Sequence, residues 1–478
     1  MCVKVDRADI RGRVQLGGCD RQGGFSSSGH EHPPVEFLIE SFEEEALGAI
    51  HPTRGLHEHS TFQEALFADA IGAVSEVNLN GVVIHGQGQV ASSIPMGAST
   101  ANFVPNSSMR VVAVGSHGRT RLEMRERPLP GPGELVLQLR ACGLCGTDLF
   151  KLAGGTVAEG TVLGHELVGT VVQLGEGTSG FSVGERVTVP HHVACGVCAL
   201  CRRGSETLCE VFRENLLEPG GFAEYVRVKP RAVEQAAYRV PEGLPDEAAV
   251  FLEPAACVLR GILRAGFRVG ESSAQVSGTP GTPGMGPQGS AVADDGTAVV
   301  LGAGGMGLLH VALLRALFPA LKILCMDLRL DRLSVASKLG ATGISTPGQM
   351  AAEGLLADLS AGLGADVVFD TVGGAEILNQ ALELSREGGT VVLFAHAPAD
   401  QRAGFDLNGL FKYERRVIGT YSGGIPEQRI VQRLLESRVF DPSRIVTHRM
   451  PLSHFERAVA LARANEALKI LLVPDEDV

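Results

Sequence analysis

Four cysteines lie close together in one stretch of the chain, spaced as Cys195-x2-Cys198-x2-Cys201-x7-Cys209. Four thiolates are a common ligand set for tetrahedral zinc, and such short spacings let one loop wrap around a single ion. Disulfide pairing is the alternative, but residues this close in a compact loop rarely meet the geometry that a disulfide needs. The spacing therefore predicts a structural zinc site whose binding free energy, about 10 kcal/mol or more, is coupled to folding.

A second set of metal-ligand residues lies outside this loop. Cys145 stands in the sequence CGLCGTD, His165 follows twenty residues later, and Glu253 precedes a proline. Three protein ligands with one open position are typical of a catalytic zinc site. Taken singly, each residue could instead be a buried cysteine, a core histidine or an exposed glutamate. Their occurrence beside a four-cysteine loop and a nucleotide motif favours the metal site.

The nucleotide motif is a glycine loop in which Gly302, Gly304 and Gly307 are spaced as GxGxxG. An apolar strand, Ala298–Leu301, precedes it, and a helical run from Met306 to Phe318 follows, which is the context that makes this motif specific. Gly302 would permit the tight turn, Gly304 would let the backbone approach a pyrophosphate, and Gly307 would allow close helix packing. The helix N-terminus would then face the phosphates.

Asp327 lies twenty residues after Gly307, at the end of the second predicted strand of this half. A carboxylate there can accept hydrogen bonds from ribose hydroxyls and would repel a 2′-phosphate, which favours NAD over NADP. Arg329 and Arg332 could shield such a phosphate instead, and Asp327 could also be a helix N-cap.

The strands and helices that must position these residues fall into two regions with different sequence patterns. From Met109 to about Cys257 short strands alternate with Gly and Pro turns, which predicts a compact antiparallel, barrel-like domain. From Thr297 strands alternate with helices, which predicts a parallel, doubly wound sheet, and after Gly424 we expect one more helix and a closing strand. The strands predicted from these patterns are Glu134–Leu139, Gly169–Leu174, Arg186–Val189, Ala298–Leu301, Lys322–Met326, Asp366–Phe369, Thr390–Phe394, Val417–Gly419 and Lys469–Val473.

Two segments stand apart from these patterns. Residues 1–108 form an N-terminal extension of unassigned role that could be a small unit or a mobile tail, and its His-Glu-His pairs at 30–32 and 57–59 fit solvated loops better than metal sites. Residues 271–296 are rich in Gly, Pro and Ser and predict a flexible insertion between a helix and a strand.

Bulk composition limits the class of protein. The 478 residues are 44% hydrophobic and 20% charged, so the chain is globular, and its net charge of −12 argues against nucleic acid or an anionic membrane as partner. No apolar run approaches a membrane span, and the N-terminus lacks the apolar core of a signal peptide. The ten cysteines show metal spacing in one cluster only, as suits a reducing compartment, so we expect a cytoplasmic enzyme.

From Met109 onward the sequence resembles the zinc-dependent medium-chain alcohol and polyol dehydrogenases, in particular the sorbitol and threonine dehydrogenase branch. The resemblance is carried, in the family's order, by Cys145-Gly-Thr-Asp148, Gly164-His-Glu166, the four-cysteine loop, Gly220-Gly-Phe-Ala-Glu-Tyr225, Glu253-Pro254 and the glycine loop. It implies a GroES-like, β-rich catalytic domain at 109–257 and 421–478, and a Rossmann NAD-binding domain at 258–420 that contains the insertion.

The resemblance also assigns roles at the catalytic zinc. Cys145 and His165 would be direct ligands, Glu166 a neighbouring carboxylate that ligates in some members, and Glu253 the third ligand of the sorbitol and threonine dehydrogenase branch. Asp148 would hydrogen-bond the second nitrogen of His165 and fix the ring.

Proton transfer is implied by the same resemblance. Thr147 would take the proton from the substrate hydroxyl, and His191 and His192 would lie near the substrate pocket unless they are surface loop residues. Many relatives carry a histidine five residues after the cysteine ligand, which relays the proton to solvent. Here that position is Phe150, so protons must leave by another path, such as water or Lys151.

These residues together predict a zinc-dependent oxidoreductase that transfers a hydride between a secondary alcohol or polyol and NAD, with two zinc ions per chain and a homodimeric or homotetrameric assembly. The alternatives are an NADPH-dependent carbonyl reductase of the same fold, or a non-catalytic dinucleotide-binding regulatory protein whose zinc ions only stabilise the fold.

Overall fold

The computed structural model describes residues 108–154, 157–269, 292–348, 350–397 and 400–475. The predicted extension at 1–108 lies outside the described residues except for Ser108, and so does the insertion from 271 to 291. No helix within the described ranges has the length and apolar character needed to cross a membrane.

An eight-stranded sheet organises the catalytic part of the chain, with strand order β15-β16-β3-β4-β5-β8 and with β6 and β7 joined to it through β3. The strands between residues 109 and 257 pair antiparallel, as the sequence predicts for this region. β15 and β16, which come from the C-terminal segment, are parallel to each other. The bounds are β3 Leu135–Gly143, β4 Glu166–Leu174, β5 Arg186–Pro190, β6 Leu217–Glu218, β7 Tyr225–Val228, β8 Tyr238–Arg239, β15 Val446–Pro451 and β16 Lys469–Val473.

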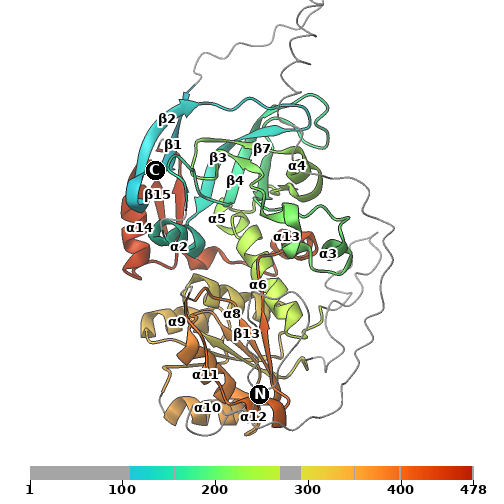
Figure 1. Cartoon of the computed structure of the whole chain (residues 1–478), viewed down its shortest axis with the longest axis vertical. Helices are drawn as coiled ribbons and strands as arrows, with labels where there is room; N and C mark the ends of the chain where they lie inside the picture. The colour runs from blue at the N-terminus through green and yellow to red at the C-terminus, as the bar shows by residue number, and fades with distance from the viewer. Residues whose placement is uncertain (1–107, 155–156, 270–291, 349, 398–399, 476–478) are drawn as a thin grey trace, which may run out of the picture. The chain divides into compact units, whose positions relative to one another are not determined.

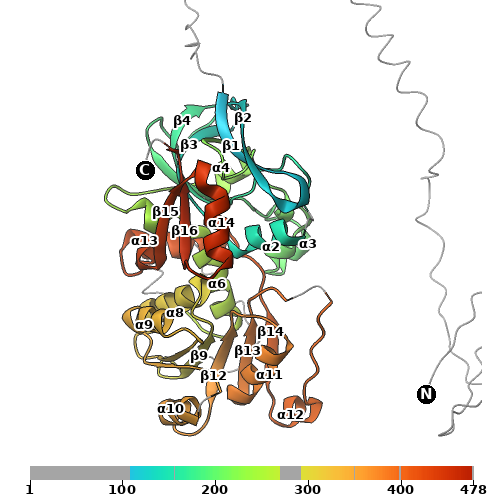
Figure 2. The ribbon, with the colours of Figure 1, turned by 90° about the vertical axis from the view of Figure 1, so that its left-hand side faces the viewer.

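Short helices and one hairpin connect and cover this sheet. The hairpin pairs β1 (Ser108–Val114) with β2 (Thr120–Glu126) and buries Met109 and Val111 in the same core as β3 and β4. The helices are α2 Gly146–Gly154, α3 Ala199–Arg202, α4 Pro230–Ala236 and α5 Asp246–Ala249. Figures 1 and 2 show that the hairpin lies beside β15 and α14, which come from the far end of the chain.

A six-stranded parallel sheet forms the nucleotide-binding part, in the order β11-β10-β9-β12-β13-β14. The predicted doubly wound sheet is confirmed, although the sequence missed β11, whose three residues are too few for a pattern. The strands are β9 Thr297–Leu301, β10 Lys322–Met326, β11 Gly343–Ser345, β12 Ala365–Asp370, β13 Ser385–Leu393 and β14 Arg416–Gly419. The helices are α8 Gly305–Leu317, α9 Leu330–Lys338, α10 Met350–Ser360, α11 Ala375–Leu384 and α12 Leu407–Lys412.

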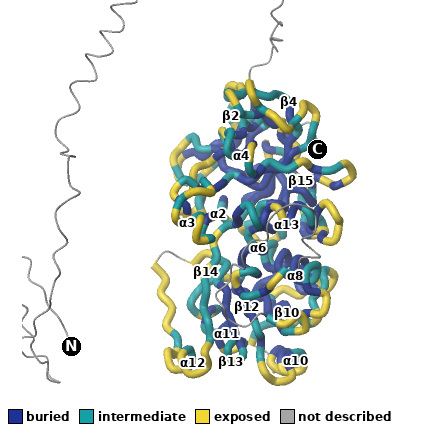
Figure 3. The backbone as a smooth tube through the Cα atoms, turned by 90° about the vertical axis from the view of Figure 1, so that its right-hand side faces the viewer, coloured by how far each residue is buried: buried dark blue, intermediate teal, exposed yellow. Residues whose placement is uncertain are grey.

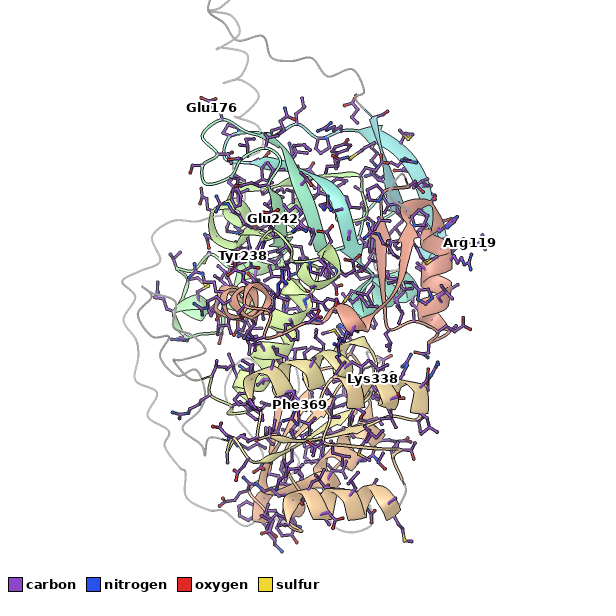
Figure 4. The ribbon with its side chains drawn as sticks, turned by 180° about the vertical axis from the view of Figure 1, so that it is seen from behind. Arg119, Glu176, Tyr238, Glu242, Lys338 and Phe369 are labelled. Carbon is purple, nitrogen blue, oxygen red and sulfur yellow. The ribbon has the colours of Figure 1, made fainter. Side chains whose placement is uncertain are left out.

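Two helices join the cores of the two parts. Helix α6 (Leu252–Arg264) packs on β4 and β5 and also on α8, and α13 (Ile425–Glu436) packs along α6. Fully buried Val258 and Leu259 of α6 share one apolar cluster with Val300 of β9 and Val431 of α13. Figure 4 shows Phe369 of that cluster within the nucleotide-binding sheet, and Figure 3 shows that burial follows the strands of both sheets.

The C-terminal region is more elaborate than the sequence predicts. After α13 the chain forms β15, then α14 (Phe455–Arg463), then β16, where we expected a single helix and a single strand. β15 reads Val-Thr-His-Arg-Met-Pro, and only Met450 in it is buried, so it carries no apolar alternation that would predict a strand. This segment positions β16, which pairs with the end of β3 that leads into Cys145.

Candidate metal and nucleotide sites

The four-cysteine loop folds its thiols into one compact cluster. The Sγ atoms lie 3.4 Å apart for Cys198 and Cys201, 3.6 Å for Cys195 and Cys209, and 3.9 Å for Cys195 and Cys201. A tetrahedron of thiolates about 2.3 Å from a zinc ion has edges of about 3.8 Å. A disulfide would need about 2.05 Å, and all four cysteines are free. The geometry fits zinc and excludes cystine.

Backbone amides favour the thiolate form in part of this cluster. The amides of Val197 and Cys198 lower the pKa of Cys195 to about 6, and the amide of Cys201 lowers the pKa of Cys198. Burial and the neighbouring thiols raise the pKa of Cys201 to about 12. Four thiolates at these separations repel one another, and a divalent cation offsets that repulsion.

The second metal cluster forms where β3 and β4 pair. Cys145 lies just after β3, His165 just before β4, and Glu166 opens β4 opposite Gly143. One ligand atom from each of these three residues lies within 4.8 Å of the others. His165 and Glu166 are buried, and Cys145 is partly buried. The structure therefore brings together three of the four residues predicted to surround this metal.

A glycine makes this arrangement possible. Gly164 has φ of +92°, and a Cβ there would lie 2.8 Å from the backbone nitrogen of Phe222. Side chains are strained at such a positive φ and would also collide here. The turn at Gly164 delivers His165 to the cluster.

Residues of the first turn of α2 hold the first two ligands. The Asp148 Oδ2 atom accepts a hydrogen bond from the backbone of Cys145 at 3.0 Å, and its Oδ1 faces the Nδ1 atom of His165 at 3.4 Å. The backbone amide of Thr147 donates to the Cys145 sulfur at 3.4 Å. Burial lowers the pKa of His165, but the charges of Asp148 and Cys145 outweigh it and raise that pKa well above its usual value. The charges around His165 are therefore negative overall and favour a cation at this point of the pocket.

Glu253 lies in the first turn of α6 and is outside the compact three-residue group. Burial raises its pKa, while the charge of His165 opposes the shift, so the two side chains are near enough to interact. The thiol of Cys257 donates to the Oε1 atom of Glu253 at 3.5 Å. The sequence reasoning missed Cys257, although its i+4 spacing from Glu253 puts both on one helix face.

A second residue that the sequence reasoning missed is Lys469 on β16. It is only 5% exposed, and its Nζ atom lies 2.6 Å and 2.9 Å from the two carboxylate oxygens of Glu166. The signal was a lysine that opens the apolar strand Lys-Ile-Leu-Leu-Val, because lysine is rarely buried without a partner.

The rings of His191 and His192 pack in a row beside the ring of His165, which belongs to the metal cluster. The ring centroids lie 4.6 Å apart for His165 and His191, 3.5 Å for His191 and His192, and 5.2 Å for His192 and Phe212. Burial lowers the pKa of His191 well below its usual value and that of His192 to about 3, so both are neutral at pH 7. The Nδ1 atom of His191 is buried and has no partner among the described residues.

Phe150 meets a histidine from the nucleotide-binding part. Its ring stacks on His396 with centroids 5.0 Å apart and planes inclined by 10°. His396 follows β13, at the carboxyl edge of the parallel sheet where ligands of such sheets bind. The sequence reasoning missed His396 because nothing local connects position 396 with position 150.

The glycine loop has the shape that a pyrophosphate needs. Gly302 has φ of +94°, and a Cβ at Gly307 would lie 1.8 Å from the carbonyl oxygen of Gly302, so α8 begins in close contact with the turn. At Gly304, which caps α8, a Cβ would meet nothing nearer than an Arg332 nitrogen at 4.0 Å. The backbone at Gly304 is therefore open to a ligand at a helix N-terminus.

Asp327 follows β10 and binds the loop as well as the next turn. Its Oδ2 atom accepts a hydrogen bond from the amide of Ala303 at 2.6 Å, and its Oδ1 accepts one from the amide of Arg329 at 2.8 Å. The side chains of Arg329 and Arg332 both donate to the carbonyl oxygen of Asn465, and Arg329 also pairs with Asp331. The carboxylate thus has a structural function in addition to any contact with a ribose.

Comparison with known proteins agrees with this arrangement. Residues 131–241 match the family model described as alcohol dehydrogenase GroES-like domain, and residues 305–437 match the one described as zinc-binding dehydrogenase. The chain belongs to the zinc-dependent medium-chain alcohol and polyol dehydrogenase family. It is an oxidoreductase that acts on CH–OH groups with a nicotinamide dinucleotide.

Individual relatives match about three quarters of this chain and nearly the whole of their own length. A sorbitol dehydrogenase of Halalkalibacterium halodurans is 28% identical over 77% of this chain and 99% of its own length. An erythritol/L-threitol dehydrogenase of Mycolicibacterium smegmatis is 29% identical over 78% of this chain and 99% of its own. A solved zinc-binding dehydrogenase of Sinorhizobium meliloti 1021, bound to NADP, superposes with a TM-score of 0.65 at 27% identity, covering 77% of this chain and all of the other.

Proposed function

We propose that this enzyme oxidises a secondary hydroxyl of a polyol with NAD and contains two zinc ions per chain, one catalytic and one structural. The observation that carries the proposal is the convergence of Cys145, His165 and Glu166 at the end of β3, separate from the four-cysteine cluster. The two curated relatives named above, which act on sorbitol and on erythritol or L-threitol, support a polyol substrate.

The residues of the site divide the chemistry among them. Zinc bound by Cys145 and His165, with Glu166 or Glu253 as a further ligand, would lower the pKa of a substrate hydroxyl, as it lowers that of water to around 7. The Thr147 hydroxyl stands beside the Cys145 ligand and relays the proton, accepting it from the substrate hydroxyl while passing its own proton on to water. Asp148 holds the His165 ring in the orientation that a ligand needs. His191 and His192, neutral at pH 7, can hydrogen-bond further hydroxyls of a polyol chain.

His396 lies where it could carry the substrate proton from the site to solvent, a route that the sequence did not suggest. Phe150 is 45% exposed and lies against the ring of His396, which is itself exposed to water. We infer that the relay histidine of other family members is replaced here by one from the nucleotide-binding part.

We also infer a homodimer or homotetramer in the cytoplasm. All eight cysteines within the described ranges are free, which suits a reducing compartment. Sedimentation of the purified chain would measure the assembly.

Turnover with a panel of substrates tests the function. We expect NAD reduction with sorbitol, erythritol, threitol or butanediol, and weaker activity with ethanol, because His191 and His192 offer partners that a simple alcohol cannot use. Absence of NAD-linked and NADP-linked turnover across polyols, L-threonine and simple alcohols would contradict the proposal.

Metal content provides the first quantitative prediction. The purified chain should contain close to two zinc ions, because the four-cysteine cluster and the Cys145 cluster share no residue. Elemental analysis measures this directly. A value near one, together with full activity, would remove one of the two assignments.

Asp327 provides the second prediction. Asp327→Ser should lower kcat/KM with NAD and raise kcat/KM with NADP, because the substitution removes a ribose acceptor and a charge that repels a 2′-phosphate. We expect the ratio of the two kcat/KM values to change by about 100-fold. Asp331→Ser is the matched control, because its carboxylate pairs with Arg329, whereas the amide of Ala303 in the glycine loop donates to Asp327. A wild-type preference for NADP would mean that Arg329 or Arg332 controls the pocket.

A further inference from the structure

Two cationic side chains flank the row of histidine rings beside the metal cluster. Lys151 lies on α2, three residues after Asp148, so the two side chains share one side of that helix. Arg213 is the last residue of a short 3-10 helix and directly follows Phe212, whose ring packs against His192 with centroids 5.2 Å apart. Lys151 thus approaches the row from the metal end, and Arg213 approaches it from the opposite end.

The charges that act on these rings are all positive. Burial is the main cause of the low pKa values of His191 and His192, and the charge of His165 lowers both further. Lys151 also lowers the pKa of both rings, and Arg213 lowers that of His192. No carboxylate of the described residues offsets these shifts. The pocket is therefore positive beside the two neutral rings, whereas the charges around the metal ligands are negative.

Both cations lack an acidic partner in the part of the chain that the structure describes. The guanidinium of Arg213 lies 5.9 Å from the ring centre of Tyr421, which follows β14, and forms no ion pair within the described ranges. The ammonium of Lys151 has no carboxylate partner there either. The buried carboxylates of the metal cluster already lie against cationic partners of their own. In a chain whose net charge is −12, these two side chains create a local positive region beside the pocket.

This arrangement divides the pocket into three parts with different chemistry. The metal end binds the hydroxyl that is oxidised. The two neutral histidines can donate and accept hydrogen bonds with further hydroxyls. The guanidinium fork of Arg213 and the ammonium of Lys151 are suited to a phosphate or a carboxylate, with which each forms charge-assisted hydrogen bonds. A neutral polyol would leave these two cations without a partner.

We propose that the substrate is a polyol with an anionic group at one end, and that Arg213 and Lys151 bind this group. The proposal rests on the proposed function, because it names the substrate class of the same site. The reaction is the one already described: the carbinol hydrogen leaves as hydride to NAD, the hydroxyl proton leaves through Thr147 to water, and the product is a ketone. The anionic group is not altered and serves recognition alone.

Matched substrates test the proposal. Sorbitol and sorbitol 6-phosphate differ only in the terminal group, and gluconate places a carboxylate at the end of a similar chain. At low ionic strength we expect kcat/KM to be about tenfold higher for at least one of the two anions than for sorbitol, because a charged partner strengthens each hydrogen bond to it. The better of the two anions identifies the group as a phosphate or a carboxylate. If sorbitol is oxidised as efficiently as both anions, the proposal is wrong.

Substitution of the two cations locates the anionic group. Arg213→Gln and Lys151→Gln should each lower the ratio of kcat/KM for the preferred anion to that for sorbitol by about tenfold. The ratio is the informative quantity, since any effect of Lys151 on proton transfer would change both rates alike. Arg203→Gln is the matched control, because this exposed arginine of the four-cysteine loop acts on neither histidine and should leave the ratio within about threefold of wild type. An unchanged ratio in Arg213→Gln, or a raised KM for NAD in its place, would overturn the proposal.

Calorimetry in the presence of NAD separates this proposal from the proposed function, because it measures binding without turnover. The wild-type enzyme should bind sorbitol 6-phosphate or gluconate about tenfold more tightly than sorbitol, and Arg213→Gln should lose this difference. If the difference is present but no polyol is oxidised, the proposed function fails while the anion-binding role of Arg213 holds. If sorbitol is oxidised and neither anion binds more tightly, the proposed function holds and Arg213 is an ordinary surface cation.

Discussion

Cys209→Ala is expected to reduce the zinc content from two ions to one and to lower the melting temperature substantially. Cys209 is 2% exposed, and its Sγ lies 3.6 Å from that of Cys195 in the cluster. Structural zinc contributes its binding free energy to folding, so loss of one thiolate should cost at least about 3 kcal/mol. In a chain of this size, whose unfolding entropy is about 1 kcal/mol per degree, that corresponds to a fall of roughly 3 °C or more.

The damage should extend beyond the loop. Arg260 of α6 donates to the carbonyl oxygen of Gly204 within the loop, and it pairs with Glu206 at 3.5 Å and with Glu427 at 3.2 Å. Because α6 also carries Glu253, a disordered loop should weaken the catalytic site. We therefore expect a decrease in kcat/KM as well as in stability.

Cys325→Ala is the matched control. Cys325 is fully buried in β10, and burial raises its pKa to about 12, so it is a thiol that serves packing alone. The same loss of one sulfur atom there should cost only about 1 kcal/mol and leave both zinc ions in place. Equal melting temperatures and zinc contents for the two variants, measured by calorimetry and elemental analysis, would contradict a structural zinc at Cys209.

The sequence predicted the parts of this site whose residues are close in the chain. Cys145, Thr147 and Asp148 stand on one turn, His165 and Glu166 on one strand start, and the glycine loop between one strand and one helix. In each case local backbone geometry dictates which residue types fit, so a single sequence contains the information. The doubly wound sheet was predicted for the same reason, because apolar strands and helices alternate in regular order.

The residues that the sequence did not reveal depend on contacts between distant segments. Lys469 meets Glu166 across 303 positions of sequence, and His396 meets Phe150 across two domains. No periodicity encodes such a pairing, since it depends on how β16 docks on β3 and on which loop faces α2. Cys257 is the exception, because its spacing from Glu253 on one helix would have revealed it.

Thr147→Ala is expected to lower kcat by about 100-fold, which is typical for loss of a positioned acid–base group. The backbone amide of Thr147 donates to the Cys145 sulfur at 3.4 Å, so the start of α2 fixes this residue beside the ligand. Among the described residues its hydroxyl has no hydrogen-bond partner, which leaves it free to accept a proton from the substrate. Steady-state kinetics with the best polyol would measure the loss.

Thr147→Ser separates the hydroxyl from the methyl group of this side chain. The serine variant keeps the proton acceptor, so it should retain most of the activity, while the alanine variant should still bind two zinc ions because the amide contact to Cys145 belongs to the backbone. KM should change little in either variant, since the interaction is made in the transition state and not in ground-state binding. A Thr147→Ala enzyme within threefold of wild-type kcat would show that the proton leaves the substrate directly to water, and that the stacked pair of Phe150 and His396 is the place to look for its exit.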